Sequence, residues 1–388
     1  MLPRERVIAA LEHREPDRIP WGEHWINHNV YEDFLGRPSL LHAGFRTTKA
    51  YWDGRRDEVV AGHKRDLIDL TQALDMDLIP VETVPPRDHQ PQPWRQVDAE
   101  TYCDEHGDLF RVSVSTGNLV LYQHAATDYV APTLESVQRD IDQLADQPLD
   151  DPADSKFEVV RHVVETMKST HYIMLLCGDL EWPTFGRTTE ERWTNLIRQP
   201  AICRKLGELQ GRRMVRDVAV FAQLGVDAIM PCGDLGSNTS LMASPRIYRD
   251  MVLPWHRAHA AAAHQHGLKI LKHCCGHVMP IIDDLADVYD AYESIQATAG
   301  MDIGRLKPLV GGRLCLWGGI WHEHILAGTP ADIRNDARYA FATAGPGGGY
   351  IMGSTHSLAT GAKPENVREM KRCRDEWGAY PLRAERWK

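Results

Sequence analysis

The stretch LKILKHCCGH at residues 268–277 joins a short apolar run to a cluster of metal-binding side chains. Its first half has the β-like character of a buried strand, and the cluster stands where that strand would end. Because side chains alternate along a strand, His273 and Cys275 share one face and Cys274 points away from it. Imidazole and thiolate are ligands that zinc prefers, so the stretch predicts a metal site at the end of a strand.

Seven further apolar runs have the same β-like character. Most are closed by Gly, Pro or a polar residue and are followed by a stretch with helical spacing, which is typical of a parallel sheet. The seven runs are residues 18–21, 77–81, 172–177, 226–231, 288–295, 313–317 and 349–352. Together with residues 268–274 they make eight strands, the number found in a (β/α)8 TIM barrel, which we predict as the fold.

Amphipathic stretches between these runs predict helices over residues 200–224, 244–266 and 330–344. The second opens with Ser244-Pro245, an N-cap residue followed by proline at the first helical position. Pro-rich and alternating residues interrupt the pattern between 85 and 130, and we expect a β-hairpin excursion near residues 90–125. No linker rich in Gly and Ser divides the chain, so residues 1–388 are predicted to form a single domain.

Bulk composition limits the classes of function. The hydrophobic share of 43% and the charged share of 25% are ordinary for a globular protein. No run approaches the ~18 apolar residues that a membrane span requires, and the start does not resemble a secretory signal, which favours a cytoplasmic protein with reduced cysteines. The net charge of -10 and the scattered basic residues argue against nucleic-acid binding.

In a (β/α) barrel the active site forms at the C-terminal ends of the strands, and several predicted strand ends carry polar residues. Asp234 suits an acid, a base or a group that orients a ligand imidazole, whereas the structural alternative is a turn aspartate that accepts backbone N–H groups. Asp179 is open to the same two interpretations. His356 follows a glycine-rich approach and fits a general acid, a metal ligand or a loop histidine.

A catalytic zinc ion needs three protein ligands and one open position, so His273 and Cys275 require a third donor from elsewhere. The H-x-C pattern alone also fits a buried cysteine pair beside a histidine that bonds to the backbone. His277 follows Gly276 and is expected to begin a helix, where capping is as well supported as ligation. Cys274 and His277 are therefore substitutes in the predicted site.

Short motifs along nearly the whole chain resemble the uroporphyrinogen decarboxylase superfamily, which also contains zinc methyltransferases that move methyl groups between corrinoid proteins and a thiol or folate acceptor. The opening residues 4–6 and 15–20 fit this resemblance, and the remaining matches lie between residues 225 and 366. They are Gly225-Val226-Asp227, Ser244-Pro245-Arg246-Ile247-Tyr248, Lys272-His273 with Cys275-Gly276, Ala299-Gly300-Met301-Asp302, Gly318-Gly319-Ile320, Gly328-Thr329-Pro330 and Pro364-Glu365-Asn366. The resemblance implies a single (β/α)8 barrel.

The branches of this superfamily differ in their motifs. The true decarboxylase carries an arginine-rich loop after the first strand, where this chain has GEHWINH at residues 22–28, so tetrapyrrole decarboxylation is not expected. The methyltransferase branch, which the chain resembles more, carries H-x-C at the fifth strand end and a further Cys at the eighth. Counting back from Glu365-Asn366 puts His356 at the position of that Cys. The resemblance implies zinc bound by His273, Cys275 and His356, unless Cys274 or His277 is a ligand and His356 is an acid or base.

The chain is thus predicted to be a zinc-dependent methyltransferase or demethylase that moves a methyl group between a small methylated substrate or a corrinoid and a thiol or folate acceptor. The corrinoid is bound directly or carried by a partner protein. Asp234 and His356 are the predicted catalytic residues. Substrate contacts are expected from four tryptophans and three polar side chains: Trp21, Trp25, Trp182, Trp317, His24, Asp179 and Gln296.

Two other functions fit the sequence. One is a decarboxylase-like lyase that acts on a small carboxylic acid through His356 and an aspartate. The other is a non-catalytic barrel that binds a metal or a corrinoid protein, although so many reactive side chains at strand ends favour an enzyme. An oligomeric state is compatible with the sequence but is not specified by it.

Overall fold

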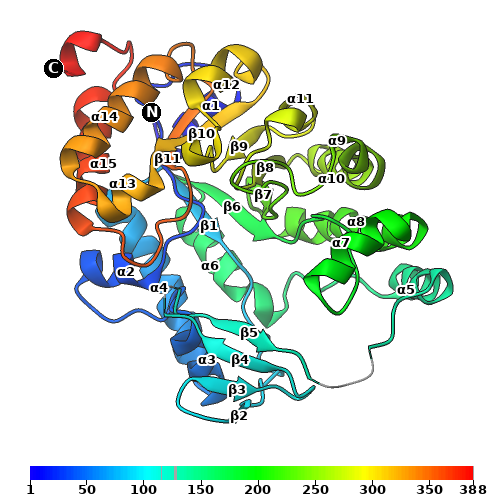
Figure 1. Ribbon diagram of the computed structural model, residues 1–388. Coiled ribbons are helices and arrows are strands. Elements are labelled where there is room, and N and C mark those ends of the chain that lie inside the picture. Colours follow the sequence, from blue (N-terminus) through cyan, green and yellow to red (C-terminus); the bar gives the residue numbers. More distant parts are fainter. Residues whose placement is uncertain (115, 126–128, 388) are drawn as a thin grey trace.

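The computed structural model describes residues 1–114, 116–125 and 129–387 and contains a curled parallel sheet of seven strands (Figure 1). The strands lie in the order β1-β6-β7-β8-β9-β10-β11. Their bounds are Leu78–Val81 (β1), Tyr172–Cys177 (β6), Ala228–Pro231 (β7), Lys269–His273 (β8), Ala291–Glu293 (β9), Cys315–Ile320 (β10) and Tyr350–Ser354 (β11). Seven of the eight predicted runs therefore form strands of one parallel sheet.

The first predicted strand, residues 18–21, is reduced to a single parallel bridge between Trp21 and Met352 of β11. On its other side, the amide of Asp77 donates to the carbonyl oxygen of Trp21. Pro20 lacks an N–H group, which limits the hydrogen bonds that this segment can make to its neighbours. The regular ladders therefore define a curled sheet of seven strands, and residues 18–21 do not form a regular eighth strand that closes it.

Helices follow most strands and cover the outer side of the sheet (Figure 1). Their bounds are Pro3–Leu11 (α1), His28–Leu35 (α2), Phe45–Trp52 (α3), Arg56–Leu74 (α4), Leu134–Asp146 (α5), Glu158–Met167 (α6), Thr189–Arg198 (α7), Pro200–Gln223 (α8), Pro245–Ile247 (α9), Leu253–Gln265 (α10), Ile282–Ala286 (α11), Ile303–Val310 (α12), His322–Ala327 (α13), Pro330–Thr343 (α14) and Pro364–Trp377 (α15). The helices predicted over residues 200–224 and 330–344 are confirmed as α8 and α14. The one predicted over residues 244–266 is divided into α9 and α10 by a π-helical segment, Tyr248–Val252, and Ser244 caps α9 by accepting the amide of Ile247. None of the helices in the described ranges is long and apolar enough to cross a membrane.

Hydrophobic residues fill both sides of the parallel sheet. Leu271 belongs to an inner cluster enclosed by the curled sheet, whereas Ile270 belongs to the larger cluster between the sheet and the helices. The alternation of β8 therefore turns His273 toward the inner side and Lys272 toward the outer side. Because the inner side opens at the carboxyl ends of the strands, His273 stands at that opening.

A second sheet, of four antiparallel strands, lies beside α3 at the lower edge in Figure 1. Its strands are Arg95–Gln96 (β2), Thr101–Cys103 (β3), Leu109–Val112 (β4) and Leu119–Gln123 (β5). It occupies the region where a hairpin is predicted, and it has four strands in place of two. Aromatic contacts attach it to α3, with the rings of Phe45 and Tyr102 centred 4.7 Å apart.

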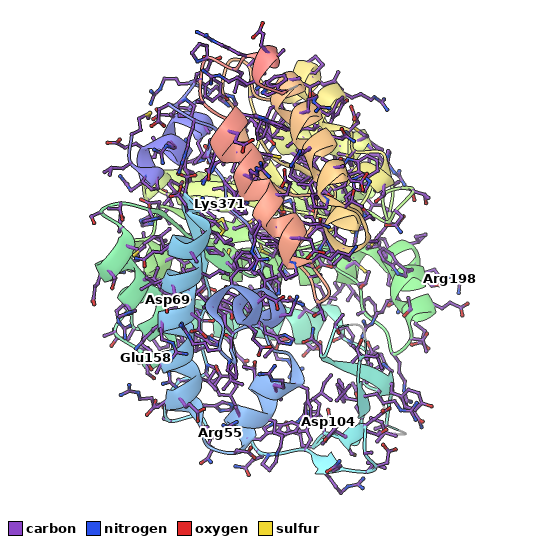
Figure 2. The ribbon with its side chains drawn as sticks, turned by 90° about the vertical axis from the view of Figure 1, so that its left-hand side faces the viewer. Arg55, Asp69, Asp104, Glu158, Arg198 and Lys371 are labelled. Atoms are coloured by element: carbon purple, nitrogen blue, oxygen red, sulfur yellow. The ribbon has the colours of Figure 1, made fainter. Side chains whose placement is uncertain are left out.

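Ion pairs hold the helices that flank β1. Figure 2 shows Glu158, the first residue of α6, beside α4. Its carboxylate pairs with Arg56 and lies 2.8 Å from the amine of Lys64, both on α4. These pairs fix α4 against α6 on the outer side of the sheet, and this supports the strand end that carries Glu82.

Candidate metal centre and active site

The imidazole of His273 is fixed by a buried carboxylate. Its Nδ1 hydrogen-bonds Glu293 at the end of the neighbouring strand β9, so Nε2 is the nitrogen left for a metal or a substrate. Burial would raise the pKa of Glu293, but the neighbouring His24 and His273 lower it to about 2. A charged carboxylate that accepts from Nδ1 orients a ligand histidine and raises its basicity.

Two further donor atoms lie near Nε2 of His273. The sulfur of Cys275 is 3.5 Å away, and Oδ1 of Asp234 is 3.8 Å away. The same Oδ1 accepts the amide of Cys275 at 2.7 Å, which ties the end of β7 to the end of β8. The three donor atoms of Asp234, His273 and Cys275 all lie within 4.8 Å of one another.

Close backbone packing makes this approach possible. Gly276, directly after Cys275, has a φ of +81° and lies against the backbone of Gly236, which follows β7. A Cβ atom at Gly276 would lie 2.5 Å from that backbone, so a side chain is excluded there. The two glycines let the loops after β7 and β8 touch, and Asp234 and Cys275 are thereby brought together.

A second group of potential ligands consists of His24, His273 and Glu293. The rings of His24 and His273 are stacked with centroids 4.1 Å apart, and Nδ1 of His24 lies 3.1 Å from Glu293. All three side chains are buried, and Nδ1 of His273 already bonds Glu293. The group around Asp234 fits zinc better, because it combines nitrogen, sulfur and oxygen donors and because Asp234 is half-exposed, which leaves an open side.

Cys275 is protonated by default in this environment, because burial raises the pKa of its thiol well above the usual range. Its sulfur also lies 3.1 Å from the hydroxyl of Ser294. Ser294 has a φ of +75°, which is strained for a residue other than glycine, and its hydroxyl donates to the carbonyl oxygen of Thr355. The place of Ser294 in the site cannot be predicted from the sequence, since a positive φ at a serine leaves no signal in the residue pattern.

His356 does not join either group of donors. Its ring centroid is 6.3 Å from that of His273, and its Nδ1 lies 2.7 Å from the hydroxyl of Ser357. Burial, reinforced by His322, lowers the pKa of His356 to about 4, so the ring is neutral near pH 7. Among the described residues, Asp234 and not His356 joins His273 and Cys275 in a group whose donor atoms lie within 4.8 Å of one another.

Cys274 and His277, the substitute ligands, have structural contacts. The sulfur of Cys274 accepts the amide of Leu235 within the outer hydrophobic cluster. Nδ1 of His277 lies 2.8 Å from the carbonyl oxygen of Ala299. Strand alternation predicts the orientation of Cys274 correctly.

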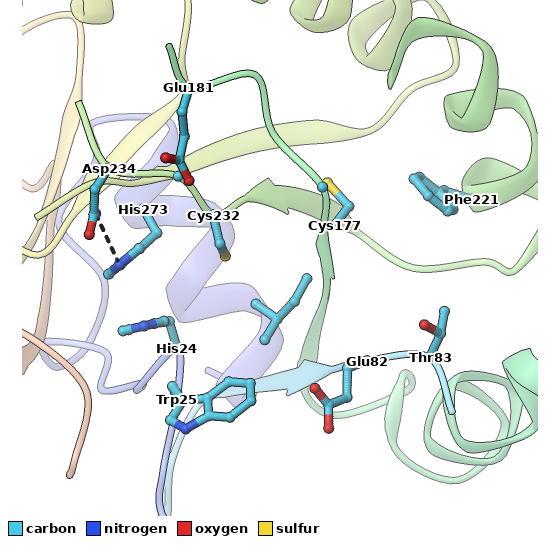
Figure 3. A pocket seen from close by; sticks show the side chains of 13 residues that line it. His24, Trp25, Glu82, Thr83, Cys177, Glu181, Phe221, Cys232, Asp234 and His273 are labelled. Atoms are coloured by element: carbon cyan, nitrogen blue, oxygen red, sulfur yellow. Dashed lines mark ion pairs between the residues drawn. The ribbon is translucent and has the colours of Figure 1, made fainter. Parts of the chain in front are cut away.

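A cavity of about 500 Å³ opens beside these donors (Figure 3). Figure 3 shows His24 between Trp25 and His273, with Asp234 beside His273, Glu181 near Asp234 and Glu82 beyond Trp25. The lining is His24, Trp25, Glu82, Thr83, Leu176, Cys177, Gly178, Glu181, Phe221, Cys232, Gly233, Asp234 and His273. It is built from the ends of β1, β6, β7 and β8, as expected for this type of sheet.

Several residues expected to contact substrate lie elsewhere. Trp21 and Trp317 are fully buried, and their indole N–H groups donate to Glu23 and to the carbonyl oxygen of Gly22. Trp182 packs in the outer hydrophobic cluster. Of the four tryptophans only Trp25 lines the cavity, because large apolar side chains next to a sheet fill its core before they line a polar opening.

Asp179 and Gln296 hold the framework of the site. Asp179 forms a buried ion pair with Lys272, and the amine of Lys272 also donates to the carbonyl oxygens of Gly233 and His273. These contacts of Lys272 join the ends of β6, β7 and β8 beneath the metal-donor atoms. Oε1 of Gln296 accepts the amide of Gly276 at 3.0 Å. The ion pair of Lys272 cannot be predicted from the sequence, because an outward direction on β8 gives no reason to place the amine near a carboxylate.

Comparisons with known proteins bear on the fold and the family. Residues 125–377 match the family model described as uroporphyrinogen decarboxylase (URO-D). A search of curated proteins gives no match. Among solved structures, a methyltransferase from Methanosarcina mazei has a TM-score of 0.64 at 15% sequence identity, and the alignment covers 97% of this chain and 99% of that chain. At this identity the likeness is one of fold.

Two other solved structures are less similar. A 3-keto-D-glucoside 4-epimerase from E. coli has a TM-score of 0.34 at 13% identity, with 56% of this chain and 85% of that chain covered. A chitinase from Chromobacterium violaceum has a TM-score of 0.38 at 9% identity, with 79% and 95% covered.

Proposed function

The chain belongs to the uroporphyrinogen decarboxylase (URO-D) family, and we propose that it is a zinc-dependent methyltransferase or demethylase. The reaction would move a methyl group between a small methylated substrate, or a corrinoid, and a thiol or folate acceptor. The observation that carries this proposal is the approach of Nε2 of His273, Sγ of Cys275 and Oδ1 of Asp234 to within 4.8 Å of one another beside a cavity.

These residues suit zinc in kind and in number. They offer one nitrogen, one sulfur and one oxygen atom, and a catalytic zinc site takes three protein ligands with one position open. A zinc ion held there would bind a thiol and deprotonate it, which makes the thiolate available as a nucleophile at neutral pH. Glu293 keeps Nε2 of His273 directed at the site, and the amide of Cys275 holds Asp234 in place.

His356 is proposed as a hydrogen-bond donor to the substrate and not as a metal ligand. Its ring lies edge-on to that of His273 at a centroid distance of 6.3 Å, and its Nδ1 accepts the amide of Ser357, so Nε2 of the neutral ring carries the N–H group. The corrinoid, where one is used, would be bound at the same opening or presented by a partner protein. His24 and Trp25 would contact the methylated substrate from the cavity wall.

A decarboxylase-like lyase is less well supported by the cavity. Recognition of a carboxylic acid calls for Arg or Lys, and no lining residue in the described part of the chain is either one. Three carboxylates line the cavity instead, those of Glu82, Glu181 and Asp234.

We further propose that residues 1–388 are one domain built as a (β/α)8 barrel in which the segment at Trp21 takes the place of the first strand. This segment lies between β1 and β11, the two edges of the seven-stranded sheet, and bonds to both.

Elemental analysis of the purified protein tests the zinc proposal. We expect about one zinc ion per chain in the wild type, and loss of zinc in His273→Ala and Cys275→Ser. Cys103→Ser is a matched control, because Cys103 is a buried free cysteine on the antiparallel sheet, remote from the site. Wild-type protein that binds no zinc would contradict the proposal.

The reaction class needs a second measurement. The protein is incubated with a methylated corrinoid and candidate thiols, and the corrinoid absorption spectrum is followed. Demethylation of the corrinoid that depends on Cys275 supports methyl transfer from a corrinoid. An unchanged spectrum with thiols and with folate acceptors would restrict the proposal to small methylated donors.

A further inference from the structure

Beyond His24, as seen from the metal donors, the cavity wall carries an aromatic ring next to a carboxylate (Figure 3). Trp25 and Glu82 both contact His42, whose ring is stacked on the indole at a centroid distance of 3.7 Å and whose Nε2 lies 3.2 Å from the carboxylate. The indole N–H of Trp25 donates to Asn27 at 2.9 Å. Trp25 therefore offers the cavity its ring surface and not a hydrogen-bond donor.

The charged side chains that line the cavity are all acidic. Glu82, Glu181 and Asp234 line it, and among the lining residues that the structure describes there is no Lys or Arg. A zinc ion bound by Asp234 and Cys275 would offset the charges of those two ligands and leave Glu82 and Glu181 facing the remaining space. Burial raises the pKa of Glu181, so Glu82 supplies the main negative charge there. Burial would raise the pKa of Glu82, but His42 and His63 lower it below the usual value, so the group is a carboxylate near pH 7.

A side cavity of about 270 Å³ continues past Trp25 and Glu82, which line both spaces. It also contains no Lys or Arg among its described lining residues. His63 lines this side cavity, is only 3% exposed, and has an Nδ1 atom without a hydrogen-bond partner among the described residues. A buried nitrogen of this kind calls for a polar group on whatever enters the side cavity.

From these features, and on the basis of the function proposed above, we propose that the methyl donor is a small onium compound, a methylated ammonium or sulfonium ion with a short polar tail. The cation would lie against the ring of Trp25 and the carboxylate of Glu82, and the tail would reach His63. A positive charge over an indole is attracted by the electrons of the ring, and a carboxylate beside it adds a direct Coulomb attraction. An anionic donor would be repelled by the same wall.

The chemistry of such a donor is balanced without an oxidant or a reductant. A thiolate sulfur forms a bond to the methyl carbon, and the bond from that carbon to the positively charged nitrogen or sulfur breaks. The electron pair of the broken bond stays on the leaving atom, which becomes a neutral amine or sulfide. The proton of the thiol goes to solvent or to a base before the transfer.

Binding of matched probes to the zinc-containing protein tests this proposal. Choline and 3,3-dimethylbutan-1-ol have the same shape, but only choline is charged. Isothermal titration calorimetry is expected to give choline a dissociation constant lower by about tenfold or more, in the range that a partly desolvated cation–π contact and a carboxylate allow. Acetate serves as the anionic probe and is expected to bind more weakly than choline.

Variants of the cavity wall show which residues cause the preference for choline over its neutral isostere. Glu82→Gln and Trp25→Leu are each expected to reduce the ratio of the two dissociation constants by at least about threefold. Phe221→Leu, on another part of the wall, is a matched control that removes apolar contact and leaves the ratio unchanged. Zinc content and the melting temperature are measured for each variant, and Trp25→Leu carries the test if Glu82→Gln does not fold.

The outcomes separate this proposal from the proposed function. Equal binding of choline and its neutral isostere, binding of neither, or a ratio that both variants leave unchanged would overturn the onium proposal. If the protein still binds zinc in that case, the proposed metal site would remain supported. A clear preference for choline in a protein that binds no zinc would support the onium site and contradict the zinc-dependent function.

Discussion

Each side of the sheet at the end of β8 carries one cysteine and one basic side chain, but the two pairs have different surroundings. On the cavity side, the sulfur of Cys275 lies 3.5 Å from Nε2 of His273 and near the half-exposed Asp234. On the other side, the sulfur of Cys274 accepts a backbone amide in the hydrophobic core, and Lys272 is paired with Asp179. Neighbouring residues thus have different roles. Those on the cavity side offer donor atoms to a metal, and those on the core side stabilise the strands that carry the donor residues.

The largest effect on stability is expected when the buried ion pair on the core side of β8 is removed. Lys272→Met leaves the charge of Asp179 buried without its ammonium partner, which costs about 3–5 kcal/mol in the free energy of unfolding. Lys269→Met is the matched control on the same strand, because its half-exposed pair with Asp290 contributes only about 0–1 kcal/mol. Urea denaturation of both variants gives the two values. Similar losses in the two variants would show that the pair with Asp179 has no special role.

A smaller effect is expected on the cavity side when the support of His273 is changed. Glu293→Gln removes the negative charge at Nδ1, and the affinity for zinc should fall about 10–100-fold. Asp290→Asn, at the other end of the same strand, is the control and should keep wild-type affinity. Competition with a chromophoric chelator measures both. An unchanged affinity in Glu293→Gln would mean that the carboxylate does not orient the ligand.

The two buried glutamates near the site are expected to respond to pH in opposite directions. Burial raises the pKa of Glu23 to about 7, against hydrogen bonds from Ser354 and Trp21. Its unfolded pKa is about 4.3, so its contribution to stability is complete below that pH and is lost as the pH rises toward 7. Glu293, with a folded pKa of about 2, contributes above pH ~4.3 and loses its contribution as the pH falls toward 2.

The corresponding amides test these signs. Glu23→Gln should raise the melting temperature relative to the wild type at pH 8 more than at pH 5, because glutamine resembles the protonated acid. Glu293→Gln should reduce the loss of stability between pH 4.3 and pH 2.5. Thermal unfolding across this range measures both, and the same pH dependence in both variants would contradict the assignment.

Much of the fold could be predicted from the sequence, since apolar runs alternating with helical stretches specify a parallel sheet with its strand ends on one side. Strand alternation also separated Cys275 from Cys274. The first predicted strand is only partly formed, because Trp21 pairs with its neighbours at isolated positions and not in a regular ladder.

The set of residues around the metal site was harder to predict. That Asp234, and not His356, approaches His273 depends on the contact between Gly236 and Gly276, which joins two loops that are distant in the sequence. The pairing of Lys272 with Asp179 is likewise set by the packing of separate strand ends. Such distances follow from tertiary structure and leave no periodic pattern.

The central claim is that Cys275 binds zinc whereas Cys274 lies in the core. X-ray absorption at the zinc edge of the zinc-loaded protein tests it most directly. We expect a single sulfur neighbour of the zinc ion at ~2.3 Å together with nitrogen and oxygen neighbours. Cys275→Ser should lose that sulfur, and Cys274→Ser should keep it. Two sulfur neighbours in the wild type, or a sulfur that disappears in Cys274→Ser and persists in Cys275→Ser, would show that Cys275 is not the single thiolate ligand.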